Sequence, residues 1–243
     1  EIVTITKDGS LHSQFISETP CQAHCIFEYI YFARLDSHLD GISVYESRIR
    51  AGVSLAKTYP VEADLVVGVP DSGLTAAKGY SEASGIPFAF AFHKNSYIGR
   101  TFIKPSQKER ETSVKIKLSV LESVVKGKRI VLVDDSIVRG TTIANIIKMM
   151  KHAGATEVHV RISSPPFLYP CYFGTDVPSN KLLIASSHST EEIRELIGAD
   201  SLGYMPIEEL QKMVGDLPIC KACFTNQYPM EVPDHEIRDL LEN

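Results

Sequence analysis

The chain lacks the segments that would place a protein in a membrane or send it out of the cell. It has no run of about 18 apolar residues, the length that a membrane-spanning helix needs. Its first residues, Glu1-Ile2-Val3-Thr4-Ile5, contain neither the basic nor the apolar region of a secretion signal. We therefore expect a cytoplasmic protein with no membrane partner.

An excess of positive charge is also missing. The 25 Lys and Arg residues are outnumbered by 30 Asp and Glu residues, which gives a formal net charge of -5. Binding to nucleic acid depends mostly on concentrated Lys and Arg side chains facing phosphates, so we expect no nucleic-acid partner. The composition, 44% hydrophobic and 23% charged, is typical of a folded soluble protein.

Cysteines are few, and their number is odd. They are Cys21, Cys25, Cys171, Cys220 and Cys223. An odd number without an export signal favours thiols or metal ligands over a framework of disulfides.

Strand-like and helix-like segments alternate along the chain. We predict strands at residues 64–69, 87–92, 129–133 and 158–163, and helices at residues 74–84 and 141–153. Apolar strands that alternate with helices indicate the α/β class, with a parallel sheet covered on both faces. Ligands bind beyond the carboxyl ends of the strands in such sheets.

Two further segments predict buried side chains. Residues 43–59 are typical of an amphipathic helix, whose apolar stripe we expect to be Tyr45, Ile49, Val53 and Ala56. The spacing of Tyr29, Tyr31 and Phe32 is that of a packed element, so we expect all three in the core.

The strongest motif covers residues 130–142, where an apolar strand ends in two acids and leads through small residues into a helix. Loop N–H groups and the helix N-terminus can hold a phosphate, with hydroxyls added by Thr141 and Thr142. Asp134 and Asp135 can bind sugar hydroxyls or Mg²⁺. The alternative is that these acids only end a strand and cap a helix. The P-loop and dinucleotide-binding glycine patterns are both absent from the sequence, which excludes those two kinds of nucleotide site.

The same motif resembles the phosphoribosyltransferase signature of four apolar residues, two acids and Gly-Thr-Thr. Residues 27–34, 69–73 and 94–103 are in addition similar to the glutamine phosphoribosylpyrophosphate amidotransferase family. The resemblance runs from about Cys25 to Tyr228. It implies a type I phosphoribosyltransferase fold, a parallel sheet with helices on both faces, and a C-terminal segment that contains cysteines.

The resemblance also implies roles for individual residues. The substrate 5-phosphoribosyl-1-pyrophosphate (PRPP) would bind through its 5-phosphate to Ser136, Ile137, Val138, Arg139, Gly140, Thr141 and Thr142. Its pyrophosphate would lie on Pro70, Asp71, Ser72 and Gly73. Magnesium would be held near Ser72, Asp134 and Asp135.

Residues 94–117 contain many basic side chains and suit a mobile lid over an anionic substrate. The resemblance assigns Lys94 and Arg100, together with Asp134 and Asp135, to catalysis, and Tyr97 to substrate binding. A solvated surface loop is the alternative for this segment.

Cys220 and Cys223 form a CxxC, a spacing that allows two thiolates to bind one metal ion or cluster. With Cys25 and Cys171 they make four, and the resemblance implies a [4Fe-4S] cluster on this set. Zn²⁺ and uncoordinated thiols are the alternatives.

By the same resemblance, residues 1–24 would be the tail of a glutaminase domain that is otherwise absent. Residues 25–180 would be the phosphoribosyltransferase core, and residues 181–243 a helical and metal-binding segment. The expected activity is amidophosphoribosyltransferase: PRPP and ammonia give 5-phosphoribosylamine and pyrophosphate, the first step of purine biosynthesis. Ammonia would come from glutamine only in the complete enzyme.

Two alternatives stay open, a purine-base salvage transferase and a regulator that binds PRPP or nucleotides without turnover. Purine nucleotides are expected inhibitors, and a homo-oligomer, a tetramer by analogy, is the expected assembly.

Overall fold

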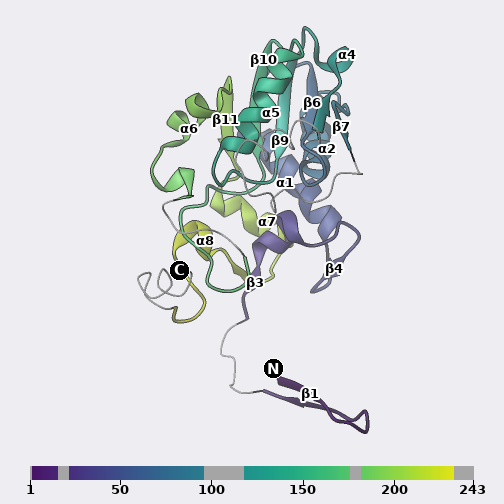
Figure 1. The fold of residues 1–243 in the computed structure, drawn as a ribbon, viewed down its shortest axis with the longest axis vertical. Helices are drawn as coiled ribbons and strands as arrows, with labels where there is room; N and C mark the ends of the chain where they lie inside the picture. Colours follow the sequence, from purple (N-terminus) through teal and green to yellow (C-terminus); the bar gives the residue numbers. More distant parts are fainter. Residues whose placement is uncertain (1, 16–21, 96–117, 176–181, 233–243) are drawn as a thin grey trace.

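The computed structural model describes residues 2–15, 22–95, 118–175 and 182–232, and a sheet of four parallel strands lies at its centre (Figure 1). The strand order is β11-β10-β9-β6, and each neighbouring pair is parallel. The strands are β6 (Leu65–Gly68), β9 (Arg129–Asp134), β10 (Glu157–Ile162) and β11 (Ser201–Tyr204). The α/β prediction and three of the predicted strands are confirmed, and β11 extends the sheet past residue 180.

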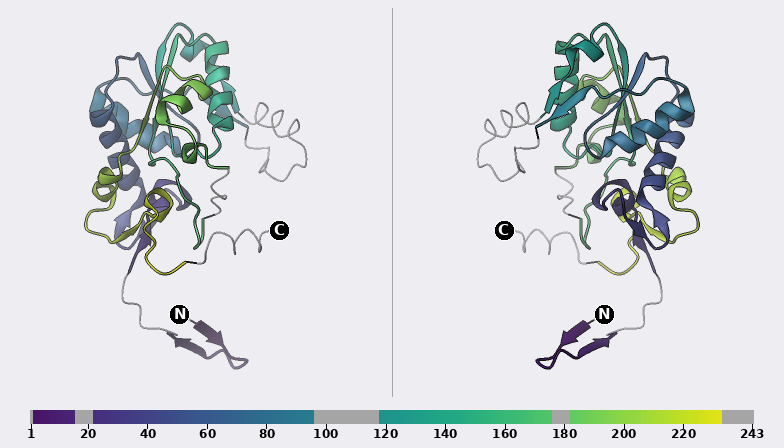
Figure 2. Two further views of the ribbon diagram at one scale, coloured as in Figure 1. Left: turned by 90° about the vertical axis from the view of Figure 1, so that its left-hand side faces the viewer. Right: turned by 90° about the vertical axis from the view of Figure 1, so that its right-hand side faces the viewer.

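Helices cover both faces of this sheet (Figure 2). They are α1 (Val44–Thr58) and α2 (Gly73–Ser84) on one face, and α5 (Thr141–His152) and α6 (Thr190–Ile197) on the other. Side chains of β9 alternate between the two cores, because successive residues of a strand point to opposite faces. Val131 and Val133 enter the core under α1 and α2, whereas Leu132 enters the core under α5. Burial on both faces explains why β9 is a continuous apolar run.

Ser43 is the N-cap of helix α1, and its hydroxyl accepts a hydrogen bond from the Glu46 N–H at 3.3 Å. The predicted apolar stripe of this helix is wrong at Tyr45, which is 43% exposed, whereas Ala56 is buried and Ile49 and Val53 are half-buried. The face that packs against the core contains Val44, Arg48, Ala51, Gly52 and Leu55. Arg48 is buried on this face, so a search for apolar residues alone does not identify the face.

Helices α1 and α2 approach closely through two glycines. A Cβ on Gly52 would lie 1.9 Å from the carbonyl oxygen of Ala76, and a Cβ on Gly79 would lie 2.2 Å from that of Ile49. Side chains larger than hydrogen at these positions would force the helices apart.

Four two-stranded pairs surround the central sheet. They are β1 (Ile2–Ile5) with β2 (Leu11–Gln14), β3 (His24–Cys25) with β12 (Ile219–Cys220), β4 (His38–Leu39) with β5 (Ile42–Ser43), and β7 (Phe92–Lys94) with β8 (Leu118–Val120). The β1–β2 hairpin lies apart from the rest in Figure 1. The strand predicted at residues 87–92 is wrong for most of its length, because only a single bridge joins Phe88 to Val66 before β7.

The remaining elements are short helices. They are η1 (Glu28–Phe32), α4 (Glu122–Val125), η4 (Ile184–Ser186), η5 (Ile207–Glu209), α7 (Leu210–Val214) and α8 (Ala222–Thr225). In η1, Tyr29 is buried as predicted, but Tyr31 and Phe32 are 47% and 44% exposed, so the core prediction is wrong for these two. Among the described residues, none of the helices combines the length and apolarity needed to cross a membrane.

We predict that Gly79→Ala destabilises the protein by about 1–3 kcal/mol, because the new methyl group overlaps a backbone carbonyl between two packed helices. The melting temperature should fall by about 2–4 °C for each kcal/mol. Gly174→Ala is the control, since no atom lies within 4 Å of the Cβ it would gain. Equal melting temperatures for the two variants would contradict the tight helix contact.

Candidate functional site

The turn from β9 to α5 places the predicted phosphate loop at the carboxyl edge of the sheet. Strand β9 ends at Asp134, and α5 begins at Thr141. Gly140, just before the helix, has φ of 79°, and a Cβ there would lie 2.9 Å from the Ile184 side chain. Thr141 and Thr142 are exposed, so their hydroxyls are available to a ligand next to the helix N-terminus.

The other four side chains of this loop, at positions 136–139, differ in exposure. The Ile137 side chain is 3% exposed and packs in the core, so only its backbone could contact a ligand. The Val138 carbonyl accepts a hydrogen bond from the Ile184 N–H at 2.9 Å, which ties the loop to the segment before α6. Arg139 is exposed, and Ser136 is half-buried.

The two acids are both buried, with 8% of each residue exposed. The Asp135 N–H donates to Asp134 Oδ1 at 2.9 Å, and the hydroxyls of Ser72 and Ser136 donate to the two oxygens of Asp135. Burial, and then the charge of Asp135, raise the pKa of Asp134 well above its ordinary value. Burial also raises the pKa of Asp135, while the bonds from both serines and the charge of Arg48 oppose that rise.

The predicted pyrophosphate loop meets this acid pair. It joins β6 to α2, and Val69 N–H donates to the Val133 carbonyl at 2.9 Å. A Cβ on Gly73 would lie 2.3 Å from the same carbonyl oxygen, so only glycine fits here. The Pro70–Asp71 peptide bond is cis. Ser72, through its bond to Asp135, connects the two loops.

Lys94 reaches this loop from β7 and forms an ion pair with Asp71. Tyr97, Arg100 and the rest of the predicted lid from residue 96 to 117 lie outside the described residues.

Arg48 belongs to this site, although the sequence did not indicate it. Its guanidinium donates to the carbonyls of Tyr29, Tyr31 and Ala33 at 2.8–2.9 Å and interacts with the charge of Asp135. Burial lowers the pKa of Arg48, and Asp135 raises it in part. The sequence does contain one indication of its burial, because Arg48 lies at helical spacing from Val44, Ala51 and Leu55.

Four cysteines from distant segments come together below the sheet. Cys25 on β3 lies opposite Cys220 on β12, and the Cys223 carbonyl accepts bonds from the N–H groups of Leu168 and Tyr169 at 3.1 Å each. Burial, and then the charges of Cys25, Cys171 and Cys220, raise the pKa of Cys223. The four side chains are thus near enough to interact. Cys21 lies outside the described residues.

The thiol of Cys171 differs from the others. Burial alone would raise its pKa, but N–H groups of Gly174, Phe173 and Thr175 point at the sulfur and lower the pKa on balance. The distance from the Phe173 N–H to this sulfur is 3.5 Å. Within the described ranges, no group of three or more His, Cys, Asp or Glu side chains surrounds one possible metal-ion position.

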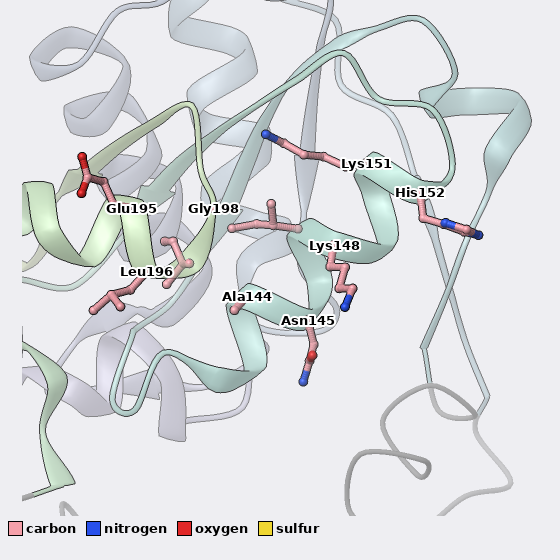
Figure 3. Close-up of a pocket in the computed structure, with 10 residues that line it drawn as sticks. Ala144, Asn145, Lys148, Lys151, His152, Glu195, Leu196 and Gly198 are labelled. Carbon is pink, nitrogen blue, oxygen red and sulfur yellow. The ribbon is translucent and has the colours of Figure 1, made fainter.

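A groove of about 540 Å³ lies elsewhere, between α5 and α6. None of the residues that line it belongs to the two loops. Figure 3 shows that the polar ends of Asn145, Lys148, Lys151 and Glu195 point in different directions. Ligand sites need polar groups that converge, so we assign no ligand to this groove.

Comparisons with known proteins agree with the geometry of the two loops. Residues 49–163 match the phosphoribosyl transferase domain. The chain is 54% identical over 96% of its length to the amidophosphoribosyltransferase of Archaeoglobus fulgidus, of which it covers 52%. It is 51% identical over 94% of its length to that of Bacillus subtilis, of which it covers 49%.

A solved structure shows the same relationship. The glutamine PRPP amidotransferase from B. subtilis, complexed with ADP and GMP, superimposes with a TM-score of 0.84 at 51% identity. The match covers 96% of this chain and 52% of that one. The predicted type I phosphoribosyltransferase fold is confirmed. The chain is therefore a relative of the amidophosphoribosyltransferases that contains a phosphoribosyl transferase domain, and it spans about half of their length.

Proposed function

We propose that this chain transfers the phosphoribosyl group of PRPP to ammonia and forms 5-phosphoribosylamine and pyrophosphate, the first step of purine biosynthesis. The observation that supports this most is the contact between the two loops, where Ser72 of the pyrophosphate loop donates to Asp135 beside the phosphate loop. A substrate with a phosphate at one end and a pyrophosphate at the other fits such a pair of loops. Relatives with this activity are similar over nearly the whole chain.

The phosphate loop would hold the 5-phosphate of the substrate. Exposed hydroxyls of Thr141 and Thr142 and the N–H groups at the start of α5 point to where a phosphate would bind. Gly140 lets the backbone come close to it. Arg139, which is exposed, would add positive charge.

The pyrophosphate loop would hold the leaving group. As the bond to the ribose breaks, negative charge grows on the pyrophosphate, and nearby donors and cations stabilise it. Lys94, which is paired with Asp71 of this loop, is a cation that could do so. No protein nucleophile is needed, because ammonia attacks the ribose carbon directly and its extra proton leaves to solvent.

Magnesium fits the oxygen-rich set of Ser72, Asp134 and Asp135, since hard divalent cations prefer carboxylate and hydroxyl oxygens. A divalent cation bound to these two buried and adjacent acids would compensate their negative charge. When bound, the metal would neutralise charge on the pyrophosphate and make it a better leaving group.

We propose further that Cys25, Cys171, Cys220 and Cys223 hold a [4Fe-4S] cluster. Four thiols would make a complete ligand set once their sulfurs turn toward a common centre, which they do not surround in the described structure, and soft sulfur ligands also suit Zn²⁺. The group would pin β12 and α8 to β3, because Cys25 already lies opposite Cys220. The transfer reaction needs no electrons, so we assign it a structural role.

Two partners follow from the relatives. Purine nucleotides would inhibit by placing their own 5-phosphate in the same loop, as the ADP and GMP complex of the B. subtilis enzyme suggests. We also propose a homo-oligomer, a tetramer by analogy, in which glutamine hydrolysis by a further domain supplies the ammonia.

The activity is tested by pyrophosphate release from PRPP with ammonia, with purine bases, and with neither. We expect pyrophosphate release in the assay with ammonia and in neither of the other two. Asp135→Asn should lower the rate by at least about 100-fold, because it removes an anion from the metal and ribose site. The exposed Asp216→Asn is the control and should keep the rate. Pyrophosphate release with a purine base would favour a salvage transferase. If no pyrophosphate is released under any of the three conditions, a regulator is favoured.

A second prediction concerns the effect of the acid pair on the stability of the folded protein when no metal is bound. The pKa of Asp134 is raised in the folded protein, so the folded state keeps its proton above pH 3.8 while the unfolded chain loses it. Stability must then fall as the pH rises through that window. Asp134→Asn should remove this penalty and raise the melting temperature at pH 7.5 by about 3 °C or more, with no gain at pH 4.

Asp200→Asn is the control of opposite sign. Burial would raise the pKa of Asp200, but bonds from the Val158 N–H and Lys151 lower it, so its carboxylate stabilises the folded state above its ordinary pKa. The melting temperature of this variant should be lower than that of the wild type at pH 7.5, and the two should become equal in acid. Melting curves in EDTA at several pH values measure both. A loss of stability in Asp134→Asn at neutral pH would contradict the assigned proton.

The cluster is tested by anaerobic purification. We expect a brown protein that contains iron and acid-labile sulfide in equal amounts. Cys223→Ser should be colourless and less stable, because α8 loses its link to β3. Cys21→Ser is the control and should stay brown. A colourless wild type with one bound zinc would contradict the cluster in favour of Zn²⁺.

A further inference from the structure

The groove between α5 and α6 combines an apolar floor with charged edges (Figure 3). The buried Ile147 and Ile197 and the small residues Ala144 and Gly198 line it. Leu196, on the α6 side, is 59% exposed, although it is a large apolar side chain. An apolar centre with a polar rim is typical of a protein–protein interface, where the polar groups need not converge on one point.

The two helices that form the groove differ in charge. Along α5, the polar side chains at the groove recur at helical spacing and are Asn145, Lys148, Lys151 and His152. Along α6, three glutamates accompany one arginine, Arg194, which pairs with Glu195 at 3.2 Å. Lys148 and Glu195 are both exposed, and Figure 3 shows them on opposite sides of the groove. One side of the groove is therefore basic and the other acidic.

A surface with one basic and one acidic side is complementary to itself. When two copies of a chain meet about a twofold axis, each uses the same patch, so α5 of one copy can face α6 of the other. Lys148 of each copy would then lie near the partner's Glu195. The exposed Leu196 would enter the partner's groove, because the small side chains of that groove leave room for it. Opposite charges across the contact would favour this pairing over others.

We infer that two copies of this chain associate through the groove between α5 and α6, with the basic α5 of each copy against the acidic α6 of the other. A stable dimer buries about 800 Å² on each partner, so the exposed faces of both helices take part together with the groove. The inference rests on the homo-oligomer proposed above and does not depend on the transfer reaction.

The pairing is tested by reversing charge on each side of the groove. Lys148→Glu makes both sides acidic and Glu195→Lys makes both basic, so each variant alone should have a dissociation constant about tenfold or more above that of the wild type. An equal mixture of the two variants should associate as strongly as the wild type, because each contact between unlike copies again joins opposite charges. Sedimentation velocity at several protein concentrations measures the dissociation constants.

The apolar part of the contact is tested by Leu196→Ala. Because the symmetry removes this side chain from the interface twice, the dissociation constant should rise by about tenfold or more. Leu121→Ala is its control, since Leu121 is also exposed but does not line the groove. Lys57→Glu is the control for charge, since this exposed lysine belongs to α1 on the other face of the sheet. Both controls should associate as the wild type does, and circular dichroism should show that every variant is folded.

Three results would overturn the inference. If the groove variants associate as strongly as the two controls, the copies meet through another surface and the proposed homo-oligomer stands. If each charge variant associates weakly and their mixture does not recover, the partner of this groove is not the same groove of a second copy. If the wild type is a monomer at every concentration, the homo-oligomer and the inference both fail, while the assay with ammonia still decides the activity.

Discussion

Two adjacent carboxyl groups, buried where β9 ends, are the constraint around which the site is built. Burying acids is unfavourable unless donors, cations or protons compensate for the lost water. Here the hydroxyls of Ser72 and Ser136 donate to Asp135, and these bonds and the charge of Arg48 lower its pKa against the effect of burial. Asp134 accepts a bond from the Asp135 N–H, and burial raises the pKa of Asp134 well above its ordinary value.

The parallel sheet explains why these groups meet. Every strand of such a sheet ends at the same edge, so the loop after β6 and the loop after β9 lie side by side. Glycine at position 73 then lets one loop lie directly on the end of the other strand. The fold thus brings together the two loops that we propose hold the phosphate and the pyrophosphate.

The cysteines show a different use of the fold. They come from three segments that are far apart in sequence, and the short β3–β12 pair brings two of them opposite each other. The CxxC spacing indicated a possible pair of ligands, but only packing shows that Cys25 and Cys171 are near it. A single metal group there would link the C-terminal part of the described chain to its first core segment.

The sequence by itself determined the class of the fold and the place of the site, because both depend on local patterns. Strands at β6, β9 and β10, the acid pair and the loop after it were all predicted from neighbouring residues. Tertiary structure alone decided which side chains are buried. The stripe of α1 was misplaced because Arg48 occupies a core position, where paired carbonyls and a buried anion make it stable.

Tertiary structure also decided that Tyr31 and Phe32 are exposed and that Phe88 forms a single bridge in place of a strand. Aromatic and β-branched residues are favourable in a core or a strand only if a neighbour is there to pack or pair with them. The identity of that neighbour depends on contacts between residues far apart in the chain. Local sequence patterns do not specify those contacts, so the burial of these side chains could be seen only in the packed fold.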